Sequence, residues 1–294
     1  MDYRKYEVWH DESKEGGYHH GLLFIPVDKK EEIIKLLKKI RKEYNIEYNH
    51  DFKFAGSLKK KFNSQVINNF LSVFAHIIKC RINYKKNIYP IKILKNNGPY
   101  RGGVETILEL EELFECKFAL LRIKDNMNSM YFDTYAKKVE TTFRFVLKSC
   151  CHSMFNNENP IEIIKFYFDG DEHHGKKIDI SNLIKGEVKE HIKINKNIDI
   201  DSRQINQRDD DTKILMNFVD NIIGSCRSIL NDESDENNAL FPLREIHERL
   251  KDNLLILNEN SEWYKSISFS DLVIENENIS FPDIFRNPQQ GTLL

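Results

Sequence analysis

Long apolar runs are absent from this chain. No stretch of about 18 uncharged apolar residues occurs, which argues against a helix that spans a membrane. The first residues, Met1 to Lys5, lead into mixed polar sequence rather than into the apolar segment of a signal peptide. With 31% charged residues, 19 Phe and 12 Tyr, the composition is typical of a globular chain and excludes a disordered one. We therefore expect a cytoplasmic protein without membrane contact.

Cysteine is scarce, and so are the short motifs of common enzyme classes. The five cysteines show no Cys-x-x-Cys spacing, so we interpret them as reduced structural thiols rather than as zinc ligands. No P-loop, no dinucleotide-binding glycine fingerprint and no Gly-x-Ser-x-Gly elbow occurs. These absences exclude the motif-defined nucleotide-binding and serine-hydrolase classes.

Two adjacent histidine pairs lack the spacing of a metal site. His19 and His20 are predicted to lie on a strand, where neighbouring side chains point to opposite faces. His173 and His174 follow an acidic loop that lacks the pattern of a calcium site. We expect structural or solvent-exposed roles for all four, the alternative being proton transfer by His173 or His174 near Asp169.

The charge is divided unevenly along the 294 residues, a length that suits one large domain or two ordinary ones. Residues 1–100 hold 20 Lys and Arg against 11 Asp and Glu, a net charge of +9, whereas the rest of the chain carries −11. This division permits a basic surface that contacts nucleic-acid phosphates. Its candidate residues are Lys59, Lys60, Lys61, Arg81, Lys85 and Lys86. The alternative is an ordinary solvated lysine face.

Strand and helix patterns alternate along the first 230 residues. Apolar runs and period-two alternation predict strands near 5–10, 19–26, 51–54, 80–95, 161–169 and 198–202. Apolar residues at helical spacing predict helices at about 28–44, 62–79, 105–122, 131–155, 178–190 and 210–230. We expect an acidic turn at 11–17, an N-cap at Asp28, and a helix near 242–257 followed by irregular chain. The alternation predicts an α/β fold, with helices packed against a sheet.

Aspartates recur at the positions where α/β sheets hold functional groups. Asp11 follows the first predicted strand, Asp51 begins a short one, Asp169 ends the strand at 161–169, and Asp220 lies in a late helix. A cation must compensate the repulsion between clustered carboxylates, and hard oxygen ligands select Mg²⁺ or Mn²⁺. Such a centre can activate water and stabilise the leaving oxygen of a phosphodiester. The alternative for each aspartate is an ordinary turn residue or helix cap.

Four segments occur in a characteristic order: Val8 to Ser13 (Val-Trp-His-Asp-Glu-Ser), Asp51 to Phe54 (Asp-Phe-Lys-Phe), Tyr167 to Asp169 (Tyr-Phe-Asp) and Leu215 to Gly224 (Leu-Met-Asn-Phe-Val-Asp-Asn-Ile-Ile-Gly). Together they resemble a bacterial family catalogued as domain of unknown function 3800. That family has motifs of the types Tyr-Ile-Asp-Glu-Ser-Gly and Glu-Leu-Lys, a strand that ends in Asp, and a helix like Leu-Gln-Leu-Ala-Asp-Leu-Ile-Ala-Gly. The resemblance spans about residues 5–230. It departs from the family where Lys14 replaces Gly, Asp51 replaces Glu and Asn217 replaces Gln.

The resemblance implies a ribonuclease H-like fold, a mixed sheet flanked by helices, with additional helices inserted and at the C-terminus. Residues 1–231 would form this domain, with a helical insertion at about 96–158. Residues 232–294 would form a helical and irregular extension packed on the same domain.

The resemblance also assigns roles to single residues. Asp11, Asp169 and Asp220 take the places of the metal ligands, and Glu12 or Asp51 completes the catalytic set. Lys53 would contact phosphate or orient a carboxylate. Arg203 belongs to a segment that resembles the Asp-Ser-Lys segment of the family, so it would face substrate phosphate.

These observations predict a nuclease-like enzyme that hydrolyses phosphodiester bonds of DNA or RNA with Mg²⁺ or Mn²⁺, in a mobile-element or antiviral defence setting. One alternative is a catalytically inactive module of the same fold that binds nucleic acid or protein. Another is a phosphohydrolase that is not a nuclease. A protein partner or a homo-oligomer is compatible with each of these hypotheses.

Overall fold

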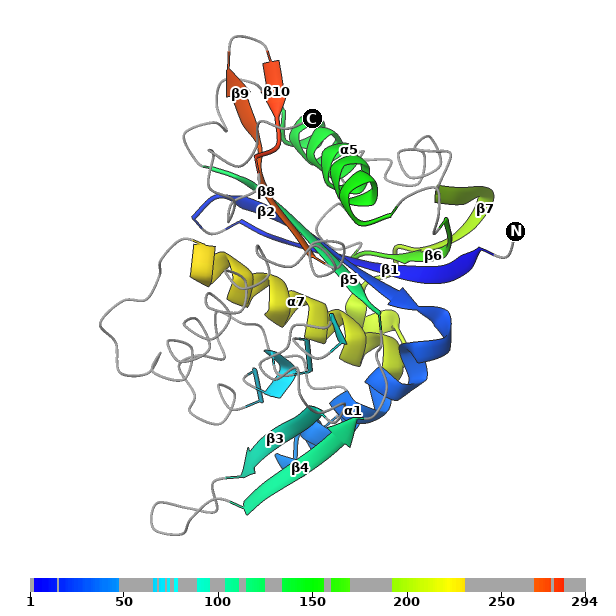
Figure 1. The fold of residues 1–294 in the computed structure, drawn as a ribbon, viewed down its shortest axis with the longest axis vertical. Coiled ribbons are helices and arrows are strands. Elements are labelled where there is room, and N and C mark those ends of the chain that lie inside the picture. Colours follow the sequence, from blue (N-terminus) through cyan, green and yellow to red (C-terminus); the bar gives the residue numbers. More distant parts are fainter. Residues whose placement is uncertain are drawn as a thin grey trace.

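A mixed six-stranded sheet with helices packed against it forms the centre of the molecule (Figure 1). The computed structural model describes residues 3–14, 16–47, 66–67, 69–71, 73–74, 77–78, 89–95, 104–110, 115–124, 134–155, 160–169, 192–230, 267–275 and 278–282. No helix in these ranges is long and apolar enough to cross a bilayer.

The strand order of the central sheet is β7-β6-β1-β2-β5-β8. The strands are β1 (Arg4–Ser13), β2 (Tyr18–Pro26), β5 (Lys117–Ile123), β6 (Ile161–Tyr167), β7 (Ile192–Asp201) and β8 (Ile267–Asp271). The first three form an antiparallel meander. On the other side of β1, β6 and then β7 add in parallel, while β8 pairs in parallel with β5. The C-terminal ends of β1, β6 and β7 therefore lie side by side.

Helices cover both faces of the sheet (Figure 1). One face carries α1 (Lys30–Glu43) and α7 (Asp210–Leu230), and the other carries α5 (Tyr135–Met154). Two short 3-10 turns, η1 (Val27–Lys29) and η3 (Ile205–Gln207), precede α1 and α7. The remaining strands form two small antiparallel pairs, β3 (Tyr89–Lys95) with β4 (Val104–Leu110) and β9 (Val273–Glu275) with β10 (Asn278–Ser280).

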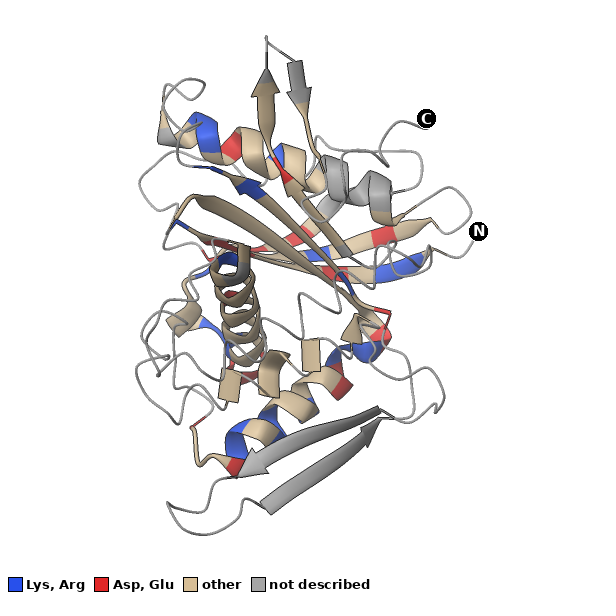
Figure 2. Ribbon diagram, turned by 60° about the vertical axis from the view of Figure 1, so that its left-hand side comes forward, with Lys and Arg blue, Asp and Glu red and all other residues tan. Residues whose placement is uncertain are grey.

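Two apolar layers flank the sheet, and β1, β2, β5 and β6 each contribute side chains to both layers. In β1, Val8 packs on the α5 side, whereas Trp9 packs on the side of α1 and α7. Both are fully buried. Figure 2 shows charged residues on the helices and also at several points along the strands. The alternation along β1 thus fixes which face each polar residue near the strand end can reach.

Several elements agree with the sequence-based expectations. The first hairpin and the helices predicted at 28–44, 131–155 and 210–230 are confirmed, and the described residues of 62–79 are helical up to Ile77. The turn of the hairpin is shorter than predicted, because β1 continues through Ser13. The cap prediction at Asp28 is wrong: α1 starts after the turn η1, and Lys29 is its cap residue, without a side-chain hydrogen bond.

Other expectations are corrected. The helix predicted at 105–122 is instead β4 and β5, so the span 96–158, expected to be helical, contributes a strand to the sheet. The chain after residue 257, expected to be irregular, holds β8, β9 and β10. Its strand β8 is stabilised by pairing with β5 and by the burial of Phe269. The predictions at 51–54, 178–190 and 242–257 fall outside the described residues.

Gly21 allows α7 to lie close to the sheet. A Cβ atom at this position would be 2.3 Å from Cδ1 and 2.4 Å from Cγ1 of Ile223 in α7. Gly21 pairs with Asp11 across the first hairpin. The close contact therefore sets the distance between α7 and the end of β1.

We predict that Gly21→Val destabilises the fold by about 1–3 kcal/mol, because the new side chain overpacks the layer and pushes α7 away. Urea unfolding measures the effect. The double variant Gly21→Val with Ile223→Ala should recover most of the loss, since it removes the clashing atoms. Equal stability of Gly21→Val and the unchanged chain would contradict this packing.

Candidate active site

Asp11 and Asp169 lie near the ends of two neighbouring parallel strands. Trp9 of β1 pairs with Tyr167 of β6. Asp11 lies two residues further along β1, and Asp169 lies two residues beyond Tyr167, the last residue of β6. Trp9 and Tyr167 pack on the α7 side of the sheet. Alternation therefore directs Asp11 to the α7 side, and Asp169 lies just past the neighbouring strand end.

A contact beyond Asp11 supports this orientation. Ser13 lies two residues further on the same face of β1, and its Oγ accepts a hydrogen bond of 3.1 Å from Nη1 of Arg227 in α7. Asp11 Oδ1 accepts a hydrogen bond of 2.8 Å from the backbone N–H of Glu12. The end of β1 therefore runs directly beneath α7.

Asp220 lies on α7, over the same end of the sheet. At its N-terminal end, α7 places Leu215 against the cavity that Trp9 also lines. Further along, Ile223 faces Gly21, the partner of Asp11. Asp220 stands between these points and is partly buried. The three predicted ligand positions thus lie near one end of the sheet, and Asp11 and Asp220 lie on its α7 side.

The described residues do not form a closed ligand set. Within the ranges given above, no three or more His, Cys, Asp and Glu side chains are grouped so that they could hold a metal ion. Asp51 and Lys53, expected to complete the site, lie outside the described residues. So do the predicted phosphate contacts Lys59, Lys60, Lys61, Arg81, Lys85 and Lys86.

Glu12 points to the opposite face. Its carboxylate accepts a hydrogen bond from the hydroxyl of Tyr18. Its Oε1 lies 2.9 Å from Nζ of Lys14, and its Oε2 lies 3.7 Å from Nε2 of the buried His20. Tyr18 belongs to the apolar layer beneath α5. Glu12 therefore does not share a face with Asp11, and we leave it out of the proposed ligand set.

Asp201, which sequence reasoning did not single out, ends β7 beside Tyr167. It is 6% exposed and receives Nε and Nη2 of Arg203 at 3.0 and 2.7 Å, with the backbone N–H of Arg203 at 3.1 Å. Burial by itself would raise the pKa of Asp201. The hydrogen bonds from Arg203 and the positive charges of Arg208 and Arg203 together outweigh burial, so the pKa of Asp201 lies below its usual range. The signal that could have found Asp201 was its place two residues before Arg203, in the segment that resembles Asp-Ser-Lys.

Arg208 forms hydrogen bonds at the ends of both β6 and β7. Its buried guanidinium donates to the backbone carbonyls of Phe168, Asp201 and Arg203. Burial lowers the pKa of Arg208, and the carboxylates of Asp201 and Asp169 oppose that lowering. Arg208 thus holds β6 and β7 at the point where Asp169 leaves the sheet.

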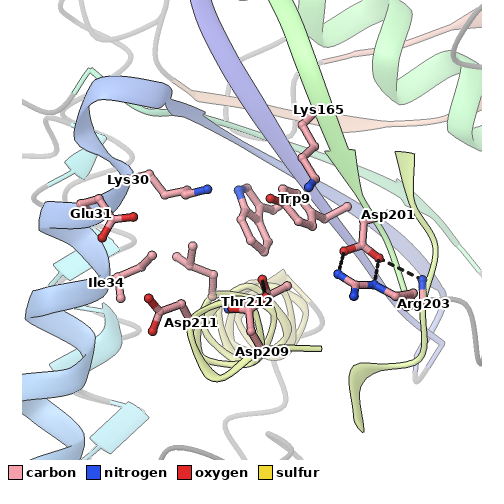
Figure 3. A pocket seen from close by; sticks show the side chains of 12 residues that line it. Trp9, Lys30, Glu31, Ile34, Lys165, Asp201, Arg203, Asp209, Asp211 and Thr212 are labelled. Atoms are coloured by element: carbon pink, nitrogen blue, oxygen red, sulfur yellow. Dashed lines mark hydrogen bonds and ion pairs between the residues drawn. The ribbon is translucent and has the colours of Figure 1, made fainter. Parts of the chain in front are cut away.

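A cavity of about 200 Å³ lies beside these residues on the same face (Figure 3). Its aromatic wall is a stacked pair, Trp9 and Tyr167, with ring centroids 3.8 Å apart and planes inclined by 9°. Charged side chains from α1, the ends of β6 and β7 and the start of α7 line the rest: Lys30, Glu31, Lys165, Asp201, Arg203, Asp209 and Asp211. Because Trp9 precedes Asp11 by two residues in β1, the cavity lies about 7 Å from Asp11 along that strand.

The first histidine pair separates as its strand position predicts. His20 lies on the α5 side, with Nδ1 2.7 Å from Nε2 of His10. His19 is fully buried on the other side. Burial, followed by the positive charges of Arg122 and Arg227, lowers the pKa of His19 to about 4.

We predict a matching pH dependence of stability. His19 stays neutral in the folded chain down to a pH of about 4, whereas its pKa in the unfolded chain is about 6.5. The unfolded chain therefore binds a proton that the folded chain does not bind. The free energy of unfolding is highest above pH 6.5 and decreases as the pH falls towards 4. The loss amounts to about 3 kcal/mol. Urea unfolding between pH 4 and 6.5 gives the free energy of unfolding as a function of pH. For His19→Leu the slope of this curve should be smaller than for the unchanged chain, by the amount that corresponds to about one bound proton. A curve as steep as that of the unchanged chain would rule out this role.

Comparison with known proteins yields no relative: no family model, no curated protein and no solved structure matches the chain. The chemistry of the site is therefore inferred from its own residues.

Proposed function

We propose that this protein is a divalent-metal-dependent nuclease that hydrolyses phosphodiester bonds of DNA or RNA. The observation that carries the proposal is that Asp11 and Asp169 lie at the C-terminal ends of adjacent parallel strands, with Asp11 on the face covered by α7, the helix that carries Asp220. Carboxylate oxygens are the ligands that Mg²⁺ and Mn²⁺ prefer. The donor chemistry fits such an ion, and Asp51 remains a candidate fourth ligand.

The sheet supports the ribonuclease H-like part of the proposal. Ribonuclease H-like folds contain an antiparallel meander of three strands, followed by two strands that add in parallel beside the first. Strands β1, β2, β5, β6 and β7 have this order and these directions, and β8 extends the edge next to β5.

Each residue then has a distinct task. Asp11, Asp169 and Asp220 would hold the metal, which when bound acts as a Lewis acid and favours deprotonation of water. Arg208 fixes the strand ends from which Asp169 projects. Arg203, with 53% of its side chain exposed, can contact a phosphate of the nucleic-acid strand outside the cavity while its Nε and Nη2 stay bound to Asp201.

A second candidate is a module of the same fold that binds nucleic acid or protein without turnover. The absence of a closed ligand set among the described residues favours it. In that case the three aspartates would shape a binding surface and would not bind a metal ion.

Incubation of the purified protein with single-stranded and double-stranded DNA, RNA and hybrid, each with Mg²⁺, Mn²⁺ or EDTA, separates the two candidates. We expect cleavage of at least one substrate with metal and none with EDTA. Binding without cleavage under every condition would favour the inactive module. Neither binding nor cleavage would contradict both.

A further inference from the structure

We propose that the cavity beside the aspartates binds one unpaired nucleobase that carries an exocyclic amino group. This inference rests on the proposed function, which supplies the nucleic-acid strand. It adds a recognition site for the base next to the cleaved bond. Because the cavity lies on the same face as Asp11, about 7 Å away along β1, one nucleic-acid strand can reach both sites.

The wall of the cavity contains a donor that lacks an acceptor. The indole Nε1 of Trp9 is buried, and no described residue accepts its hydrogen bond. Figure 3 shows Trp9 and Lys30 pointing toward one another. An indole N–H and an ammonium group only donate, and Lys30 binds Glu7 through both carboxylate oxygens at 3.0 Å. A ligand acceptor, such as a ring carbonyl or ring nitrogen, would satisfy the indole.

Carboxylates on the helices supply acceptors. Asp209 caps α7 by accepting hydrogen bonds from the backbone N–H of Thr212 at 2.9 Å and from its hydroxyl at 2.8 Å. Asp211 forms an ion pair with Lys38, and Glu31 is exposed at the start of α1. Ionised carboxylates only accept, so these groups favour a ligand with N–H donors. Bases with an amino group combine such donors with acceptors on one edge.

The charges disfavour a phosphate in the same cavity. Among the lining side chains, the carboxylates Glu31, Asp201, Asp209 and Asp211 outnumber the cations Lys30, Lys165 and Arg203. Each of these cations already binds a carboxylate: Glu7, Asp199 at 2.8 Å and Asp201, respectively. A dianionic group would face net repulsion. A neutral base avoids this repulsion, and the cavity volume admits a single small ligand and no base pair.

Fluorescence of Trp9 reports on occupancy. The chain has two tryptophans, so Trp263→Phe leaves Trp9 as the only one. We expect a saturable change with cytidine, roughly tenfold weaker binding of uridine, which has a carbonyl in place of the amino group, and no change with inorganic phosphate. Glu31→Gln should weaken cytidine binding roughly tenfold, whereas Glu140→Gln on α5 should have no effect. Calorimetry on the unaltered chain gives the same affinities if Trp263→Phe does not fold.

Oligomers distinguish a base in a strand from a free nucleoside. In EDTA, a single-stranded oligocytidylate should bind roughly tenfold more tightly than an abasic sugar-phosphate oligomer of equal length, and a duplex should leave the Trp9 signal unchanged. No response to cytidine or oligocytidylate, or an equal response to phosphate or to the abasic oligomer, would overturn the inference. These binding experiments measure no turnover, so they are independent of the cleavage assay. If cleavage is observed but the base does not bind, only this inference is refuted. Base binding without cleavage refutes only the nuclease.

Discussion

Replacing Asp169 with asparagine is expected to reduce cleavage more than about 100-fold while leaving the melting temperature unchanged or raised. Loss of even the outer partners of metal ligands costs 10- to 100-fold, and loss of a ligand should cost more. The asparagine also removes the repulsion between Asp169 and the other proposed ligands in the metal-free protein. Cleavage rates and thermal unfolding of the same preparations test both parts.

A carboxylate on the other face provides the control. Glu140 lies on α5, so Glu140→Gln makes the same chemical change at a distance from the site and should preserve cleavage. Asp11→Asn should behave as Asp169→Asn does. A variant at Asp169 that cleaves normally but unfolds at a much lower temperature would identify this residue as a structural turn.

Replacing Arg208 with methionine is expected to destabilise the fold by about 3–5 kcal/mol. The change leaves the carbonyls of Phe168 and Arg203 without the donor that they have now. It also removes the ion pair of 3.8 Å between Arg208 and the buried carboxylate of Asp201. Arg208→Lys should recover only part of the loss, because an ammonium group lacks the planar fork that reaches several acceptors.

Chemical denaturation measures this effect, with Arg144→Met as the control. Arg144 is exposed on α5, and its replacement should change stability by no more than about 0.5 kcal/mol. If Arg208→Met were as stable as Arg144→Met, the strand ends would be held by other contacts, and the positioning role assigned to Arg208 would be wrong.

The spacing of apolar residues was sufficient to predict those helices and strands that have one buried face. In α1, Ile33, Leu37 and Ile40 recur at helical spacing and are fully buried, so the periodicity predicted the helix correctly. In β5, consecutive residues from Phe118 to Ile123 are buried because both faces of the strand are covered. Such a continuous apolar run has no strand period, which is why it was mistaken for a helix.

The site was predictable where it depends on strand ends and not where it depends on contacts between distant segments. The sequence pattern predicted that Asp11 and Asp169 lie at one end of the sheet, although Asp11 lies within β1 and only Asp169 follows its strand. The role of Arg208 depends on β6 and β7 ending together, and the cavity depends on α1 approaching α7. Neither the common end of β6 and β7 nor the contact between α1 and α7 can be predicted from the spacing of residues along the chain.

Titration of the purified protein with Mn²⁺, followed by the electron paramagnetic resonance signal of the free ion, tests most directly whether Asp11, Asp169 and Asp220 share a divalent cation. We predict saturable binding that Mg²⁺ competes away and that each single Asp→Asn variant at these positions weakens at least about tenfold, whereas Glu140→Gln leaves it unchanged. Titration curves of the three variants that superimpose on that of the unaltered chain would contradict the proposed metal centre.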